Sequence, residues 1–224
     1  ARVSGLLMDG ELRRAAQIAD TAALAVADST EWTTDELKQF AHSIVSHDPV
    51  ISGFSFAWAK GKGPSGNELQ SESARRRDGG VEEYDLQKIV DYANDPRFIQ
   101  LKNTREAFWS DSIHEDPTKN SNIVFYISPI LRDNVFLGAT VVDVQIDRLS
   151  ELTRQIGLGK GTWFLLDNTG TLVGVGQSAD ASTVEKPSSA LQSTIEMVTK
   201  KTNDSSLFSR VSGSEAEVAI RAFS

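Results

Sequence analysis

Small apolar residues recur at helical spacing near the start of the chain. They stand four, three and four positions apart: Ala15, Ala19, Ala22 and Val26. Charged residues occupy the other sides of the axis, so the pattern predicts a long amphipathic helix from about Ser4 to Asp28. Its small side chains suit close packing, either on the rest of the chain or against a second copy.

A second helix is predicted directly afterwards. Thr33 and Glu36 have the spacing of a capping box, which satisfies backbone N–H groups at a helix start. One apolar stripe follows and stops before Pro49: Leu37, Phe40, Ala41, Ile44 and Val45. We therefore expect a helix over residues 33–46.

Beyond Pro49 the hydrophobic period changes to two, which is typical of a strand. Phe54, Phe56 and Trp58 alternate with smaller residues, and a glycine-rich loop over residues 60–66 ends the pattern. A polar stretch and a mixed segment then extend to Phe108, and we expect short strands, turns and a helix there.

The strongest β signal lies in the middle of the chain. Residues 122–130 alternate, Arg132-Asp133-Asn134 has turn composition, and residues 135–144 are almost continuously apolar. This pattern predicts a central hairpin. Apolar spacing over residues 146–156 then predicts a helix that ends at Gly157.

A smaller unit is predicted after this helix. It contains a hairpin over 162–166 and 171–175, a helix over 189–200 and strands over 207–211 and 216–223. Roughly 60 residues are too few to close such a sheet securely, so the unit is expected to be incomplete. We therefore divide the chain into an N-terminal helix (1–30), a main module (31–158) and a smaller module (159–224), an α+β organisation with antiparallel sheets.

Composition narrows the function. The 224 residues are 39% hydrophobic and 24% charged, as in a folded globular protein, and the net charge of −8 argues against nucleic-acid binding. The chain has no cysteine, which excludes disulfides and thiolate metal sites. No stretch reaches the roughly 18 apolar residues of a membrane span, and the N-terminus lacks signal-peptide features, so we expect a soluble segment.

Motifs for catalysis or cofactor binding do not fit their structural contexts. The glycines of residues 157–161 follow a predicted helix and open a strand, the reverse of a phosphate-binding loop. His42, His47 and His114 lack the spacing of metal ligands, and no serine lies in a Gly-x-Ser-x-Gly elbow. We predict a protein that is not an enzyme, with no catalytic residues, no metal and no cofactor.

Two carboxylates are candidates for ligand binding. Asp143 ends an apolar strand, where its charge needs an arginine, a ligand ammonium, backbone N–H groups or solvent. Trp109 stands beside Asp111, and such a pair can hold an amine, although a tryptophan can equally cover a core. Tyr126 lies on the strand that should pair with that of Asp143, so the two share a cavity if the register places them on one face.

The order of these segments resembles the double Cache domain, a PAS-like extracytoplasmic sensor of bacterial chemoreceptors, sensor kinases, diguanylate cyclases and phosphatases. The resemblance covers nearly the whole chain. It is carried by Phe108-Trp109-Ser110-Asp111-Ser112, by the strand over 124–130, by the strand over 137–144 with Gly138 and Asp143, and by the hairpin over 164–170.

The resemblance implies two stacked PAS-like modules on one long helix, with a ligand in the membrane-distal module. It implies the extracytoplasmic, periplasmic portion of an inner-membrane signal transducer that senses a small molecule. The ligand-binding residues it implies are Trp109, Asp111, Tyr126, Asp143, Phe98 and Trp58. The Arg-x-Trp-Tyr element of amino-acid-binding members is absent, and Pro96-Arg97-Phe98-Ile99 stands in its place.

The expected ligand carries an amine or several hydroxyl groups, and the N-terminal helix is expected to support a homodimer. Two other readings stay open at this point. One is a protein-interaction module of an exported receptor with no small-molecule ligand. The other is a hydrolase or isomerase that uses Asp111 and Asp143.

Overall fold

The computed structural model describes residues 2–29, 31–66, 69–77, 79–110, 114–116, 121–145, 148, 151, 162–166, 172–177, 207–210 and 217–220. Contacts divide the chain into two compact units, and one of them comprises residues 12–110 and 124–145. This main unit carries the candidate site. Of the helix predicted over 146–156 only Arg148 and Glu151 are described, both of them helical, and the helix predicted over 189–200 lies outside the described residues. The boundaries at 30 and 158 stay a prediction.

Both predicted N-terminal helices are confirmed. Helix α1 spans Arg2–Asp28 and α2 spans Thr34–His47. The capping box is complete, because the Glu36 amide donates to Thr33 Oγ1 over 3.3 Å and the Thr33 amide donates to Glu36 Oε2 over 2.9 Å. No helix among the described residues is long and apolar enough to cross a membrane.

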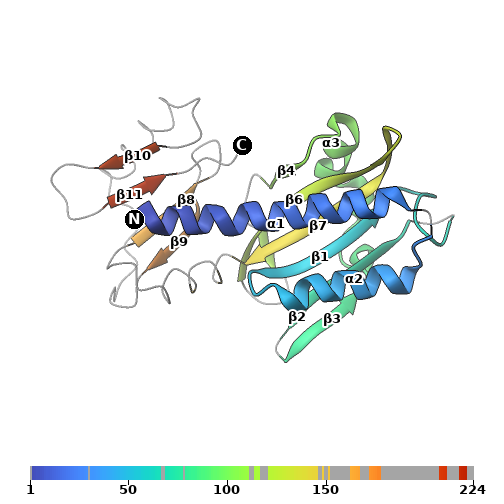
Figure 1. The fold of residues 1–224 in the computed structure, drawn as a ribbon, viewed down its shortest axis with the longest axis horizontal. Coiled ribbons are helices and arrows are strands. Elements are labelled where there is room, and N and C mark those ends of the chain that lie inside the picture. The colour runs from blue at the N-terminus through green and yellow to red at the C-terminus, as the bar shows by residue number, and fades with distance from the viewer. Residues whose placement is uncertain are drawn as a thin grey trace. The chain divides into compact units, whose positions relative to one another are not determined.

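A seven-stranded sheet forms the centre of the fold, with the strand order β3-β2-β1-β7-β6-β4 and β5 paired to β6 (Figure 1). Its strands are β1 (Ile51–Trp58), β2 (Ser71–Arg77), β3 (Gly80–Tyr84), β4 (Phe108–Trp109), β5 (His114–Asp116), β6 (Ser121–Arg132) and β7 (Val135–Gln145). The registers of β1 with β2 and β7, of β2 with β3, and of β6 with β4 and β5 are all antiparallel. The predicted antiparallel sheet is confirmed.

The central hairpin turns where its composition predicts. Asp133 and Asn134 join β6 to β7, with φ of 49° and 62°. Aspartate and asparagine tolerate this left-handed region better than most residues, and two-residue hairpin turns commonly require it.

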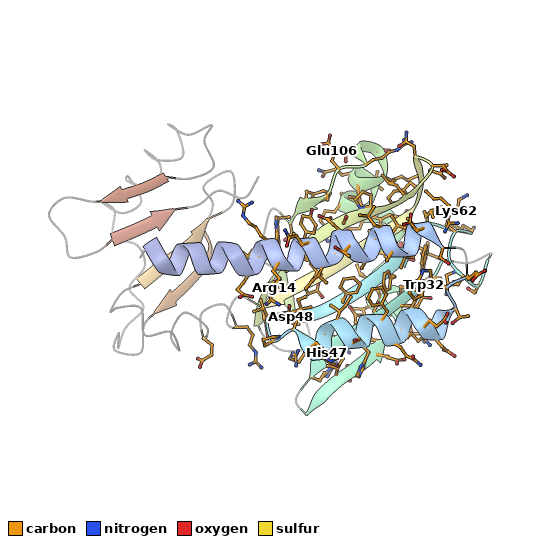
Figure 2. The ribbon with its side chains drawn as sticks, viewed as in Figure 1. Arg14, Trp32, His47, Asp48, Lys62 and Glu106 are labelled. Carbon is orange, nitrogen blue, oxygen red and sulfur yellow. The ribbon has the colours of Figure 1, made fainter. Side chains whose placement is uncertain are left out.

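Helices α1 and α2 pack on one face of the sheet, here called the α1 face (Figure 1). Phe56 of β1 contacts Phe40 of α2 with ring centroids 5.7 Å apart. Its partner across the strands, Thr140, donates from Oγ1 to the Ala19 carbonyl of α1 over 3.0 Å. Trp32, between the two helices, stacks on Phe40 at the same centroid distance (Figure 2).

The alanine stripe of α1 faces this sheet. Ala15, Ala19, Ala22 and Val26 are each at most 1% exposed. Small side chains let the helix backbone approach closely enough for Thr140 to reach a helical carbonyl. Of the two alternatives left open for this stripe, packing on the rest of the chain is the one that the structure shows, and a homodimer through α1 stays a prediction.

The opposite face of the sheet, here called the α3 face, is covered at one end. Helix α3 (Pro96–Thr104) and the short 3-10 helix η2 (Tyr92–Asn94) follow another 3-10 turn, η1 (Leu86–Lys88). An apolar cluster joins them to the sheet: Ala57, Tyr92, Phe98, Leu101, Phe125, Ile127, Phe136 and Ala139. This cluster leaves the other end of the α3 face to polar side chains.

The smaller unit contains two described hairpins. Strands β8 (Thr162–Leu166) and β9 (Leu172–Gln177) pair antiparallel, as do β10 (Leu207–Arg210) and β11 (Glu217–Ile220). The strands predicted in this part of the chain are confirmed.

Candidate functional site

Two of the predicted ligand-binding residues lie together on the α1 face. Trp109 pairs with Tyr126 across β4 and β6, and their ring centroids are 5.2 Å apart. The Tyr126 hydroxyl donates to Asp20 Oδ1 of α1 over 3.2 Å. Burial and the Asp20 charge raise the pKa of Tyr126 to about 12, so the hydroxyl keeps its proton and acts as a donor.

Asp143 lies on the opposite face from Tyr126. Thr140 points to α1, and residues 140 and 143 of β7 face opposite sides, because side chains alternate along a strand and the β1–β7 register is regular from Gly53 to Trp58. The prediction that Asp143 and Tyr126 face one cavity is therefore wrong. The sequence could not settle this point, since a shift of one residue exchanges the faces.

The remaining predicted residues also divide between the two faces. Trp58 points to the α1 face, where Nε1 donates to Glu72 Oε2 over 2.6 Å. Phe98 lies in the apolar cluster on the α3 face, with Tyr92 and Phe136 at centroid distances of 5.3 and 5.4 Å. Asp111 lies outside the described residues.

Glu72 is a buried acid that the sequence reading missed. It is 0% exposed, and besides Trp58 it accepts a hydrogen bond from Gln70. Burial raises the pKa of Glu72, although these two hydrogen bonds and Lys38 oppose the shift. An acid whose pKa is raised in the fold binds protons more readily when folded, so its contribution to stability is lost as pH rises through the folded pKa.

We expect Glu72→Gln to remove the loss of stability that the buried Glu72 carboxylate causes as pH rises. The amide oxygen can still accept from Trp58, and no charge has to be buried. The variant's unfolding free energy relative to the parent should therefore increase from about pH 4 to about pH 7. Urea unfolding at several pH values measures this difference, with the exposed Glu83→Gln as the matched control. A difference that does not change with pH would contradict the assignment.

A row of charged residues crosses four strands on the α3 face. Glu82 of β3 pairs with Arg75 of β2, Arg75 pairs with Gly53 of β1, and Gly53 pairs with Asp143 of β7. A Cβ atom on Gly53 would collide with the Asp143 carboxylate. Because Gly53 has no side chain, the Asp143 carboxylate has room to lie above Gly53.

A second row next to it carries hydroxyl groups. Tyr84 pairs with Ser73, Ser73 pairs with Ser55, and the Ser55 and Tyr84 oxygens lie 3.3 Å apart. Ser73 is 1% exposed, and its hydroxyl lies beside that of Tyr84. Burial and the nearby Asp143 charge raise the pKa of Tyr84, so its hydroxyl stays protonated. We call these two rows the polar patch: Gly53, Ser55, Ser73, Arg75, Glu82, Tyr84 and Asp143.

The charges of the polar patch are unevenly placed. Glu82 Oε1 lies 2.7 Å from Nε of both Arg75 and Arg77, so one carboxylate serves two guanidinium groups. The Arg75 guanidinium also stacks over the Tyr84 ring at 4.8 Å. Asp143 stands at the other end of the row and offers a negative charge beside hydroxyl donors. The arrangement can bind a positively charged or hydroxylated group, and it contains no nucleophile with an adjacent base.

Most of the polar patch was missed from sequence. Ser73 and Arg75 lie in a polar stretch, now strand β2, whose sequence does not alternate and so did not single out either residue. Gly53 carries no chemical group at all. Asp143 alone was identified, because a carboxylate that ends an apolar strand is conspicuous.

The comparisons with known proteins concern the fold. No family model and no curated protein sequence matches the chain. The extracellular domain assigned to histidine kinase soHK1S-Z6 is similar in structure, with a TM-score of 0.67, 20% identity, and coverage of 87% of this chain and 76% of that one.

Chemoreceptor domains are similar as well. The ligand-binding domain of Pseudomonas aeruginosa PAO1 PctC, in complex with GABA, has a TM-score of 0.55 at 11% identity and covers 84% of this chain and 77% of that one. The Campylobacter jejuni Tlp3 domain with L-valine has a TM-score of 0.52 at 14% identity, over 82% and 73% of the two chains. The chain thus has the fold of these extracellular sensor domains, and the predicted α+β fold with a long N-terminal helix and an antiparallel sheet is confirmed.

Proposed function

We propose that the chain is the extracytoplasmic small-molecule-sensing region of a membrane-bound signal transducer, with its ligand on the polar patch. One observation carries the proposal. The Asp143 carboxylate lies over Gly53, beside Tyr84, whose hydroxyl adjoins those of Ser55 and Ser73. A carboxylate among hydroxyl groups offers the charge and the hydrogen bonds that bind a polar, positively charged ligand.

The ligand we propose carries an ammonium group. Asp143 supplies its counter-ion and Tyr84 a neighbouring hydroxyl, whereas Arg75 of the patch and the adjacent Arg77 both pair with Glu82. The solved complexes support this chemistry, since GABA and L-valine both carry amines. The chain itself has a binding role and no catalysis, and it is tethered to the membrane within a longer protein. A homodimer through α1 stays a prediction and would have to use the exposed side that bears Leu24.

Thermal unfolding with matched ligands tests the proposal. The probes are L-valine and GABA, each compared with its deaminated counterpart, isovalerate or butyrate. An amine bound by Asp143 adds about 2.7 kcal/mol of stability at one hundred times its Kd. We expect at least one amine to raise the unfolding temperature while its counterpart does not.

Asp143→Asn should abolish this stabilisation and leave the ligand-free protein folded. The substitution removes the charge and keeps the size of the side chain. Asp133→Asn in the exposed β6–β7 turn is the matched control, because it removes the same charge away from the patch. An equal ligand-induced shift in Asp143→Asn and the parent would reject the assigned role of Asp143.

The alternative is a protein-interaction module without a small-molecule ligand. A dry pocket filled by Phe54, Phe56, Trp58 and Phe98 would favour it. Only Phe98 lies on the α3 face, while the strand residues face the helices. A fold that leaves a polar patch beside its apolar cluster favours a small polar ligand over the alternative.

A further inference from the structure

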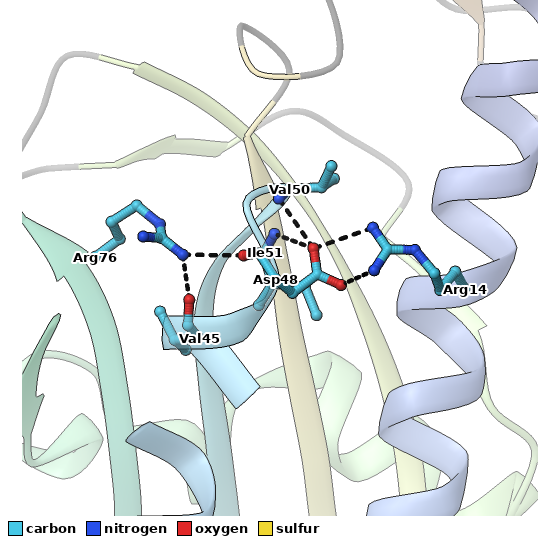
Figure 3. Close-up of polar contacts among 6 residues, drawn as sticks. All are labelled: Arg14, Val45, Asp48, Val50, Ile51 and Arg76. Carbon is cyan, nitrogen blue, oxygen red and sulfur yellow. Dashed lines mark hydrogen bonds and ion pairs between the residues drawn. The ribbon is translucent and has the colours of Figure 1, made fainter. Parts of the chain in front are cut away.

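Asp48 caps the C-terminus of helix α2 and lies three residues before strand β1. It precedes Pro49, and its extended backbone (φ −110°, ψ 111°) is the conformation that a following proline favours. Each of its polar atoms has a partner (Figure 3). Its amide donates to the Ile44 carbonyl over 3.2 Å, and its Oδ1 accepts from the Val50 amide over 2.9 Å and the Ile51 amide over 3.4 Å.

Helix α1 is tied to this junction by Arg14. Both terminal nitrogens of Arg14 donate to the Asp48 carboxylate, with Nη2 3.1 Å from Oδ1. The two side chains point toward one another from α1 and from the end of α2 (Figures 2 and 3). Such a bidentate pair fixes geometry as well as charge.

The two members of the pair are unequally buried. The Asp48 side chain is 6% exposed and that of Arg14 is 44% exposed. If the pair opens, the Arg14 guanidinium reaches water, and Asp48 keeps its hydrogen bonds from the Val50 and Ile51 amides. The pair can therefore have a closed and an open arrangement without leaving an unpartnered buried charge.

The junction and the polar patch share two strands. On β2, Arg76 donates to the Val45 and Asp48 carbonyls, while the neighbouring Arg75 belongs to the patch. On β1, the Ile51 amide donates to Asp48, and Gly53 pairs with Asp143 two residues later. The register of β1 with β7 shifts between Ile51 and Gly53, so the strand pairing is irregular where the two sites meet.

We propose that the Arg14–Asp48 ion pair is a latch that couples the polar patch to helix α1. The inference rests on the proposed ligand site, and it adds the contacts through which that site would affect helix α1. A ligand at Asp143 and Tyr84 displaces the residues of β1 and β2 with which they pair. These two strands also contact Asp48, so the displacement changes the ion pair between Asp48 and Arg14. Such coupling equals the difference in ligand affinity between the closed and open arrangements.

Hydrogen exchange tests the latch without any ligand. Two variants perturb the patch: Gly53→Ala, whose Cβ displaces the Asp143 carboxylate, and Asp143→Asn. Asp48→Asn weakens the latch and retains an oxygen for the Val50 amide. We expect amide exchange in α1 residues 12–20 to rise about five-fold in each of these single variants. Arg14→Gln should raise it similarly, and Asp133→Asn should leave it unchanged.

The double variants decide the outcome. If the patch acts through the latch, adding Gly53→Ala or Asp143→Asn to Asp48→Asn gives no further increase in α1 exchange. Increases that multiply, or no response of α1 to either patch variant, would overturn the proposal. If Gly53→Ala raises exchange throughout the chain, Asp143→Asn decides, since it alters no backbone contact. If the patch variants change amide exchange in α1 but no amine stabilises the protein, the proposed ligand is rejected and the proposed latch is retained.

Discussion

Asp48→Ala is expected to lower the unfolding free energy by about 2–4 kcal/mol, because it takes the carboxylate acceptor away from two buried amides, those of Val50 and Ile51. Val50 and Ile51, which donate those amides, are at most 1% exposed, so water cannot replace the carboxylate without opening the structure. The loss of Arg14's partner adds less, since that guanidinium is partly in water. Urea unfolding followed by tryptophan fluorescence measures the change.

Asp48→Asn is the control that separates these two contributions. Its side-chain oxygen can still accept from Val50, while the charge that attracts Arg14 is gone. We expect a loss of about 1 kcal/mol for this variant. If Asp48→Asn is as destabilising as Asp48→Ala, the ion pair carries the stability and the backbone bonds do not.

Gly138→Ala is expected to lower the unfolding free energy by about 1–3 kcal/mol, because β7 and β1 approach too closely there for a side chain. A Cβ on Gly138 would collide with the Ala57 carbonyl oxygen and come within 2.9 Å of Trp58 Cα. Both atoms belong to the backbone of a strand that is buried along its whole length. Neither can move without shifting the strand, so denaturant unfolding should show a lower midpoint with an unchanged slope.

Gly53→Ala is the matched control for Gly138→Ala. It lies on the neighbouring strand, and its Cβ would meet the end of the Asp143 side chain, which can rotate away. We expect a smaller loss of stability than for Gly138→Ala. The reverse order would mean that the Asp143 carboxylate is held in place as firmly as the backbone.

Local sequence patterns predicted most of the elements correctly. The capping residues Thr33 and Glu36 identified the start of α2, and the Asp133-Asn134 turn identified the central hairpin. These features depend on neighbouring residues, so the chain need not be folded for them to be recognised. The alternation of Phe54, Phe56 and Trp58 likewise predicted that these side chains share one face, and they do.

The candidate site was predicted far less well. Tyr126 and Asp143 were assigned to one cavity, but Tyr126 bonds to Asp20 of α1 and Asp143 lies on the other face. Ser73 and Tyr84 of the polar patch stand in a stretch without a clear pattern. Asp48 attracted no notice, because its partner Arg14 is 34 residues away.

The sequence by itself determined the bounds of α2, of β1 and of the central hairpin to within a few residues, that the main sheet is antiparallel, and that Asp143 is an unusual carboxylate in an apolar strand. Tertiary structure alone decided that the alanine stripe of α1 packs on its own sheet, and which side chains share a face. The physical reason is the separation along the sequence over which each interaction acts. Capping, turns and periodicity act over a few residues, whereas strand register and the pairing of Arg14 with Asp48 depend on segments that meet only after the chain has folded.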